Sequence, residues 1–228
     1  MARQLTFDLP VRPARGREAF FVTPANQTAL AQVEDWRDWP QGKLVLVGPE
    51  GSGKTHLTHV WAAQSGARVV AAGALAGTGL PELAAEGAVA VEDADRAAGD
   101  AAAERALFHL HNLLLAEGGA LLVTARHAPR DWPLTLPDLK SRMEATATAH
   151  LQGPDDALLA ALLVKLFADR QLAVDPGLVA YLVDRMDRSF AAAQALVEAL
   201  DHEALATGRK PGIRLAAEVL DKAQGPAP

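Results

Sequence analysis

Cysteine is absent from the 228-residue sequence. Without it the protein can form no disulfide bond, no thiolate metal site and no cysteine nucleophile, which fits a reducing compartment. An excess of basic residues is missing too, because 28 acidic residues outnumber 22 lysines and arginines and leave a formal net charge of −6. Proteins that bind nucleic acid by themselves usually carry a basic excess, so we expect any contact with DNA to be indirect.

Long apolar segments are also lacking. The first residues lead into no apolar run of the kind that signal peptides contain. The apolar stretch 158–167 is interrupted by Lys165 and is too short to span a bilayer. We therefore expect a soluble, cytoplasmic protein without membrane contact. Half of the residues are hydrophobic and alanine is frequent among them, which provides for a sizeable core rich in helices.

The glycine-rich segment 48–55, with the sequence Gly-Pro-Glu-Gly-Ser-Gly-Lys-Thr, is the strongest motif in the chain. It follows the apolar run 44–47, a predicted strand, and precedes an apolar pattern with helical spacing. This order is typical of a phosphate-binding P-loop, whose glycines let backbone N–H groups converge while the next helix adds its positive dipole end. We predict that Lys54 reaches the β- and γ-phosphates of a nucleotide and that Thr55 places its hydroxyl on Mg²⁺. The predicted phosphate cradle comprises Gly48, Gly51, Ser52, Gly53, Lys54 and Thr55.

Two further predicted strands end on polar residues that suit the same site. The apolar run 88–91 ends at Glu92 and Asp93, as a Walker B strand does when one acid joins the Mg²⁺ shell and another polarises the attacking water. The run 120–124 ends at Thr124, whose hydroxyl would point towards the γ-phosphate. Each signal is weak by itself and gains weight from the preceding P-loop.

The pattern along the chain divides it into three parts. Residues 1–18 contain the prolines, glycine and arginines of an extended tail, residues 19–152 alternate predicted strands and helices, and residues 153–228 hold predicted helices alone. The expected fold is therefore α/β, a nucleotide-binding core with a parallel sheet flanked by helices, followed by a small all-helical lid domain. The four helices expected in the last part cover about 154–170, 176–186, 189–206 and 214–223.

An apolar island in the tail, with Leu5, Phe7 and Leu9 after Gln4, allows two interpretations. These residues form a short edge strand packed on the body of the protein, or they anchor a linear peptide in a groove of another protein. Phe21 likewise serves as a core residue or as part of a wall around an adenine base. The residues alone leave both pairs of alternatives open.

Several segments, taken in order, resemble the AAA+ ATPases and within them the DnaA-related group. They are residues 20–27, the P-loop with His56 and Leu57 behind it, residues 124–126 and residues 136–142. The likeness covers about residues 20–205 and implies an AAA+ core that binds ADP or ATP with Mg²⁺. The resemblance implies that Phe21, His56 and the sensor 2 residue Arg188 contact the nucleotide, and that Thr55 and Glu92 belong to the metal shell. It also implies that Asp93 and the sensor 1 residue Thr124 take part in hydrolysis. Arg142 would be an arginine finger.

Two departures from DnaA bear on function. Too few residues follow the predicted lid for the DNA-binding domain of DnaA, and residues 4–9 resemble the peptide with which replication proteins bind the β sliding clamp. The resemblance therefore implies a negative regulator of replication initiation. Held by the DNA-loaded clamp, it would place Arg142 in trans at the ATP bound to DnaA and leave inactive ADP-bound DnaA. The clamp and DnaA are the expected partners, and a homodimer that covers the apolar tail is an alternative.

The first acidic position of the Walker B motif differs from the DnaA-like pattern, which usually has aspartate where this chain has Glu92. The extra methylene group moves the carboxylate, and Mg²⁺ demands tight octahedral geometry. We therefore expect weak or absent intrinsic ATP hydrolysis. Two other interpretations remain: a self-sufficient AAA+ ATPase that loads or remodels another replication protein, and an adaptor whose nucleotide site is vestigial. The first requires the chain's own hydrolysis, and the second requires no catalytic arginine.

Overall fold

The computed structural model of the chain describes residue 22 and residues 26–224. The predicted tail 1–18, with the candidate clamp-binding residues Gln4, Leu5, Phe7 and Leu9, lies outside the described residues, and so does Phe21. Interpretations of those residues therefore stay predictions.

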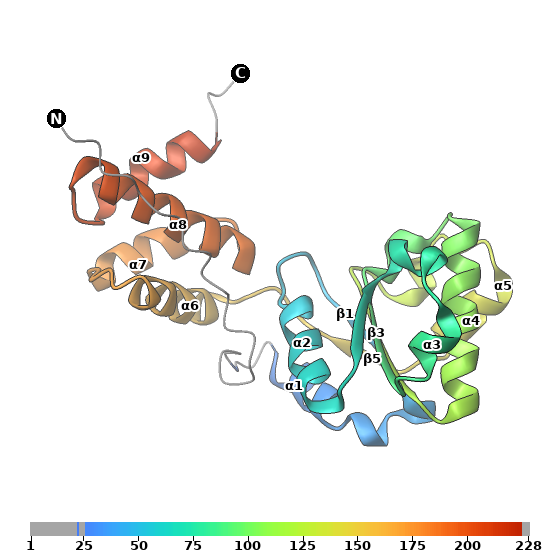
Figure 1. Cartoon of the computed structure of the whole chain (residues 1–228). Helices are drawn as coiled ribbons and strands as arrows, with labels where there is room; N and C mark the ends of the chain where they lie inside the picture. Colours follow the sequence, from blue (N-terminus) through green and yellow to red (C-terminus); the bar gives the residue numbers. More distant parts are fainter. Residues whose placement is uncertain (1–21, 23–25, 225–228) are drawn as a thin grey trace.

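Within the described residues, a five-stranded parallel sheet forms the centre of the larger part of the molecule (Figure 1). Its order is β2-β3-β4-β1-β5, which places the strand before the P-loop between the fourth and fifth strands of the chain. Each neighbouring pair is parallel, as the predicted α/β fold requires. The strands are β1 (Lys43–Val47), β2 (Arg68–Ala71), β3 (Ala88–Glu92), β4 (Ala120–Ala125) and β5 (Thr148–His150).

Helices cover both faces of the sheet, so its central strands are buried throughout and read as continuous apolar runs. Alternate residues of β1 point to opposite faces. Leu44 and Leu46 pack in one hydrophobic cluster with α1 and α2, whereas Val45 and Val47 pack in another with α3, α4 and α5. These helices are α1 (Gln27–Glu34), α2 (Lys54–Ser65), α3 (Leu80–Ala84), α4 (Ala101–Glu117) and α5 (Pro137–Glu144).

Trp61 anchors the helix that follows the P-loop. Its side chain is fully buried and stacks on Trp39, with ring centroids 5.3 Å apart. Burial of one large apolar side chain contributes about 1.5–3 kcal/mol, and stacked aromatic pairs add about 0.5–1.5 kcal/mol. The body of α2, the helix that begins at the end of the P-loop, is thereby fixed against the sheet.

Four helices make up the described C-terminal part, up to residue 224, and group to one side of the sheet in Figure 1. They are α6 (Asp156–Asp169), α7 (Pro176–Val183), α8 (Phe190–Thr207) and α9 (Ile213–Gln224). Their apolar side chains form a hydrophobic cluster of their own, which includes Leu163, Phe167 and Leu182. Side chains of Asp155, Asp175 and Ser189 accept backbone N–H hydrogen bonds at the starts of α6, α7 and α8. The helices expected from the sequence are therefore present, and α6, α7 and α8 each begin at a side chain that caps them.

The last strand ends at His150 and α6 begins at Asp156, on either side of the proposed boundary near residue 153 between a core and a lid domain. Within residue 22 and residues 26–224, no helix is both long and apolar enough to cross a membrane.

Candidate nucleotide-binding site

The P-loop runs from Gly48, directly after β1, to Lys54, the first residue of α2. A Cβ atom on Gly48 would lie 2.6 Å from the carbonyl oxygen of Leu151 and 2.7 Å from Oγ of Ser52, so only glycine fits. Gly51 has a φ of +71°, in the left-handed region, and a Cβ atom there would collide with Ser189. The strand, loop and helix therefore follow in the predicted order, with glycines where the backbone is crowded.

Lys54 is buried beneath this loop. Its Nζ donates hydrogen bonds to the carbonyl oxygens of Gly48 at 2.6 Å and Pro49 at 2.8 Å. Burial lowers the pKa of Lys54, and the nearby carboxylates of Asp93 and Asp95 partly oppose that shift. The ammonium group therefore lies between the loop and the acidic residues after β3.

The carboxyl ends of β3 and β4 are joined by hydrogen bonds close to the loop. The N–H of Asp93 donates to Oγ1 of Thr124 at 3.1 Å, and the N–H of Arg126 donates to Oδ2 of Asp95 at 3.0 Å. Asp93 adopts a φ of +55°, which is uncommon outside glycine. Oε1 of Glu92, at the end of β3, is buried and has no hydrogen-bond partner among the described residues. An unsatisfied buried acceptor costs about 1–3 kcal/mol, which is typical of a group that awaits a ligand.

Sequence reasoning missed the ion pair that connects β4 to the loop. Nη2 of Arg126 lies 2.8 Å from Oε2 of Glu50. Both side chains are partly exposed, so the pair contributes at most about 1 kcal/mol to stability. The ion pair matters for position rather than for stability, because it joins the end of β4 to the P-loop. The sequence did contain a hint of this ion pair, because Arg126 comes two residues after Thr124 at the end of a predicted strand and Glu50 lies inside the loop motif.

The helical part touches the P-loop through the start of α8. The N–H of Phe190 donates to the carbonyl oxygen of Gly51 at 3.2 Å, and Ser189 caps α8 by accepting from the N–H of Ala192 at 3.0 Å. Arg188, the expected sensor 2 residue, therefore lies two residues from this contact. Its guanidinium pairs with Asp156 in the first turn of α6, and both side chains are exposed.

These residues fit a magnesium–nucleotide complex. The cradle is too crowded for Cβ atoms at Gly48 and Gly51, and buried Oγ of Ser52 has no partner among the described residues. No group of three or more histidine and acidic side chains within the described part could hold a metal ion alone. Mg²⁺ in phosphate sites needs only one or two protein ligands beside the phosphates, and the predicted ligands Thr55 and Glu92 supply that number. Thr55 and His56 follow Lys54 in the first turn of α2.

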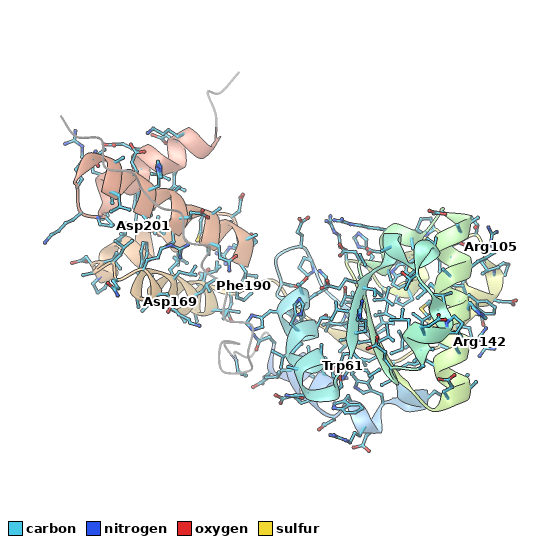
Figure 2. The ribbon with its side chains drawn as sticks, viewed as in Figure 1. Trp61, Arg105, Arg142, Asp169, Phe190 and Asp201 are labelled. Atoms are coloured by element: carbon cyan, nitrogen blue, oxygen red, sulfur yellow. The ribbon has the colours of Figure 1, made fainter. Side chains whose placement is uncertain are left out.

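Arg142 lies away from this site. It sits in the last turn of α5, is exposed, and lines a cavity of about 230 Å³ together with His111 and Lys43, the first residue of β1. The P-loop begins at the other end of β1, about 15 Å further along the strand. Figure 2 shows Arg142 on the opposite side of the sheet from Phe190, the first residue of α8 in the helical part. Arg142 therefore does not belong to the phosphate site of its own chain.

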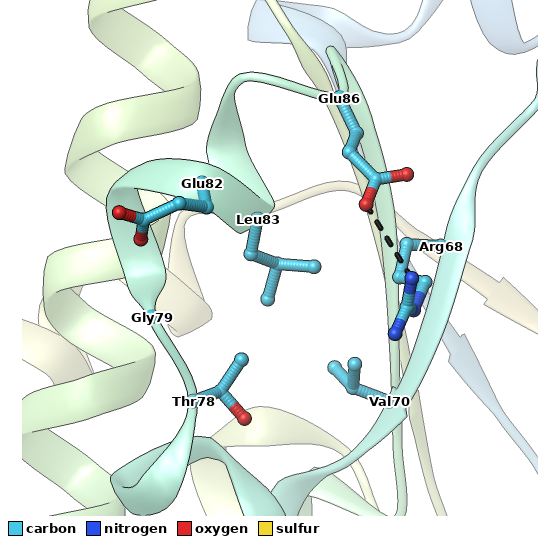
Figure 3. Close-up of a pocket in the computed structure, with 7 residues that line it drawn as sticks. All are labelled: Arg68, Val70, Thr78, Gly79, Glu82, Leu83 and Glu86. Atoms are coloured by element: carbon cyan, nitrogen blue, oxygen red, sulfur yellow. Dashed lines mark ion pairs between the residues drawn. The ribbon is translucent and has the colours of Figure 1, made fainter.

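A second cavity, of about 410 Å³, is a different feature (Figure 3). It lies between the edge strand β2 and α3, and an ion pair of 3.6 Å joins Arg68 to Glu86 beside it. None of the predicted site residues within the described part of the chain lines it, so this cavity and the candidate nucleotide-binding residues are in different places.

No protein-family model matches the chain. Solved structures do resemble it. Domain III of the replication initiation protein DnaA from Thermotoga maritima aligns with a TM-score of 0.80 and 18% identity over 96% of this chain and 100% of that one. AMPPCP-bound DnaA from Aquifex aeolicus aligns with a TM-score of 0.68 and 15% identity over 79% and 63% of the two chains. The RuvB Holliday junction branch migration motor from Thermotoga maritima gives 0.69 and 15% over 91% and 72%.

At such identities the likeness shows the fold. The chain has a DnaA-like AAA+ fold, an α/β P-loop core with a parallel sheet flanked by helices, and the predicted fold class is confirmed.

Proposed function

We propose that the chain is an Hda-like negative regulator of replication initiation. Bound to the DNA-loaded sliding clamp, it stimulates hydrolysis of the ATP held by DnaA and leaves DnaA in its inactive ADP-bound form. One observation carries the proposal: Arg142 is exposed at the end of β1 opposite the P-loop, so it acts on a nucleotide that another protein holds.

Arg142 is well placed for that role because its helix is fixed. Leu139 and Met143, on either side of it in α5, are both fully buried. None of the ion pairs among the described residues involves Arg142, which leaves its guanidinium available to a partner. A guanidinium at a γ-phosphate stabilises the charge of the transferring group and is worth about 10³–10⁵ in rate. A rigid support keeps the entropy lost on binding small.

The sliding clamp is proposed as a partner because residues 4–9 resemble a clamp-binding peptide. The resemblance rests on Gln4, Leu5, Phe7 and Leu9. Tethering to a clamp on DNA raises the effective concentration of this chain near DnaA. Weak contacts between two AAA+ modules then suffice for encounter. DNA itself remains an indirect partner, in agreement with the net charge of −6.

The chain's own P-loop is proposed to bind ADP or ATP with Mg²⁺. When bound, the nucleotide supplies negative charge and a bridge between the two parts of the molecule. Lys54 and Ser52 would donate hydrogen bonds to phosphate oxygens. Arg188 would leave its ion pair with Asp156 and bind the nucleotide instead. Glu92 is one methylene longer than aspartate, and Asp93 already holds Arg96 at 3.4 Å. Both features weaken intrinsic hydrolysis, so we propose a structural and regulatory nucleotide.

The proposal is tested by single-turnover hydrolysis of ATP that was bound to DnaA beforehand. The rate is compared with and without DNA-loaded clamp, for the full chain and for a chain that lacks residues 4–9. We expect acceleration only with the full chain and the clamp together. Rapid ATP turnover by the purified chain alone would instead support a self-sufficient loader. Clamp binding without acceleration would support an adaptor.

A further inference from the structure

The wall of the cavity beside Arg142 includes Lys43, a buried lysine whose ammonium group has no partner among the described residues. Lys43 is 2% exposed, and its Nζ makes no hydrogen bond or ion pair with any described residue. It lies on the same face of β1 as Val45 and Val47, which pack with α4 and α5. Buried charges are normally paired, because burial of an isolated charge is unfavourable. An unpaired buried ammonium at the wall of a cavity therefore points to a ligand.

The other charged and titratable groups around this cavity reinforce its positive character. Arg142 faces Lys43 from α5, and His111 faces it from α4. Burial, and then the Arg142 charge, lower the pKa of Lys43 to about 8, so the ammonium form still prevails at pH 7. Burial first, and then the charges of Lys43 and Arg142, lower the pKa of His111 to about 4 despite a hydrogen bond with Asn112. His111 is thus neutral at pH 7, and no carboxylate is among the described residues that line the cavity.

The size of the cavity and its hydrogen-bond donors limit which ligands can bind there. Its volume of about 230 Å³ is small beside the roughly 300–1,000 Å³ typical of pockets for drug-sized molecules, so a whole nucleotide does not fit inside. Ser141 adds a hydroxyl donor to the two cations. Lysine, arginine and hydroxyl donors together match the oxygen atoms of a compact, multiply charged anion.

We propose that Lys43 and Arg142 bind a small oxyanion of the phosphate class in the cavity between β1, α4 and α5. The anion is either free phosphate or the terminal phosphate of a nucleotide held by a partner, and the second source rests on the proposed function. In that case Lys43 is a second cation beside the arginine finger. The site is separate from the P-loop, because the two lie at opposite ends of β1.

Lysine side-chain NMR tests the proposal directly, because each lysine ε-carbon reports separately. The full chain is labelled with ¹³C at the lysine ε-carbons and titrated at pH 7 with sodium phosphate or with sodium chloride of equal ionic strength. Lys43→Met identifies the Lys43 signal. We expect phosphate alone to shift that signal saturably and to raise the pKa of Lys43 above about 8. The exposed Lys140 is the internal control.

Arginine variants provide the matched comparison. Arg142→Ala is expected to weaken phosphate binding at Lys43 by about tenfold, the effect of losing one charge-assisted contact. Arg105→Ala, at an exposed position of α4, is expected to leave it unchanged. Equal affinities in the two variants would contradict the assignment of Arg142 to the site.

The signals of Lys43 and Lys54 separate the two proposals. If phosphate and nucleotide shift the Lys54 signal while the Lys43 signal stays fixed, the cavity is no anion site and the P-loop assignment stands. If only the Lys43 signal responds, the cavity proposal stands and the nucleotide part of the proposed function falls. Once phosphate binding is shown, slower hydrolysis of DnaA-bound ATP with Lys43→Met assigns the partner's phosphate as ligand, and an unchanged rate assigns the free anion.

Discussion

The N–H of Phe190, at the start of α8, donates a hydrogen bond of 3.2 Å to the carbonyl oxygen of Gly51 in the P-loop. This contact connects the helical part of the chain to the P-loop. A nucleotide at the loop would therefore be sensed by α8, and a movement of α8 would change the loop.

The first prediction concerns Gly51→Ala. The new Cβ atom would collide with Ser189 and sits at a φ of +71°, so α8 must move away from the loop. We expect ADP affinity, measured by calorimetry, to fall by at least about tenfold, which corresponds to about 1.4 kcal/mol. Gly66→Ala is the matched control, because Gly66 has a φ of +74° and no atom of the described residues lies within 4 Å of its Cβ position. Similar losses of affinity in both variants would show that backbone strain, and not the contact with α8, is responsible.

The second prediction concerns Glu104, a fully buried carboxylate that supports the helix of the proposed arginine finger. It accepts hydrogen bonds from the N–H groups of Gly99, Thr135 and Leu136 and from the hydroxyl of Thr135, at 2.8–3.1 Å. Leu136 directly precedes α5, so Glu104 fixes the start of that helix. Burial alone would raise the pKa of Glu104, but these hydrogen bonds hold it below its ordinary value.

Glu104→Gln is therefore expected to lower the free energy of unfolding by about 2–4 kcal/mol, since an amide cannot accept all of these bonds. Because the folded state lowers the pKa of Glu104, its stabilising effect is complete above the ordinary value of 4.5 and is lost as the pH falls through the folded value. Urea unfolding across this range, with Glu117→Gln at an exposed position of α4 as control, measures both effects. Equal stability of the two variants at pH 7 would contradict this role.

The third prediction concerns the stability effect of Lys43. Its pKa is about 8 in the folded protein and 10.5 ordinarily, so the unfolded chain binds the proton more tightly between these values. Stability is thus lost as the pH falls from 10.5 towards 8, by about 3 kcal/mol in total. Lys43→Met, which keeps the apolar stem, is expected to be more stable than the natural chain at pH 7 in chloride buffer. That advantage should shrink as the pH rises to 10.5, and a constant difference in unfolding free energy would refute it.

The fourth prediction concerns Glu92→Asp. Shortening the side chain restores the acid that DnaA-like proteins usually have at this place and brings the carboxylate into a geometry that Mg²⁺ favours. Phosphate release by the purified chain, without DnaA or clamp, is expected to rise by about tenfold or more, a change of about 1.4 kcal/mol in the barrier. Glu86→Asp, at an exposed position, controls for the substitution itself. A lower rate in Glu92→Asp would show that Glu92 is not what limits hydrolysis.

Most of the fold could be predicted from local patterns in the sequence. The P-loop, the apolar strands and the start signals at Asp155, Asp175 and Ser189 each depend on residues close together in the chain, so they could be predicted. The strand β5 could not, because it has only three residues and its two ends, Thr148 and His150, are not fully buried. Its position beside β1 depends on pairing rather than on an apolar run.

The site depends more on contacts between distant residues. Asp93 and Thr124, and likewise Asp95 and Arg126, are 31 positions apart, so their hydrogen bonds follow only once β3 and β4 lie side by side. Thr124 was predicted to face a γ-phosphate, and the structure places its hydroxyl on the N–H of Asp93. Lys43 gave no signal, because a lysine at the start of a strand is ordinarily exposed, and its burial results from α4 and α5.

The central claim is that Arg142 acts in trans on the ATP of DnaA, and single-turnover hydrolysis of that ATP tests it most directly. With DNA-loaded clamp present, the natural chain and the surface control Arg105→Ala are expected to accelerate hydrolysis equally. Arg142→Ala is expected to lose about 10³-fold or more of the acceleration while it keeps its clamp and nucleotide binding. Full acceleration by Arg142→Ala would contradict the account.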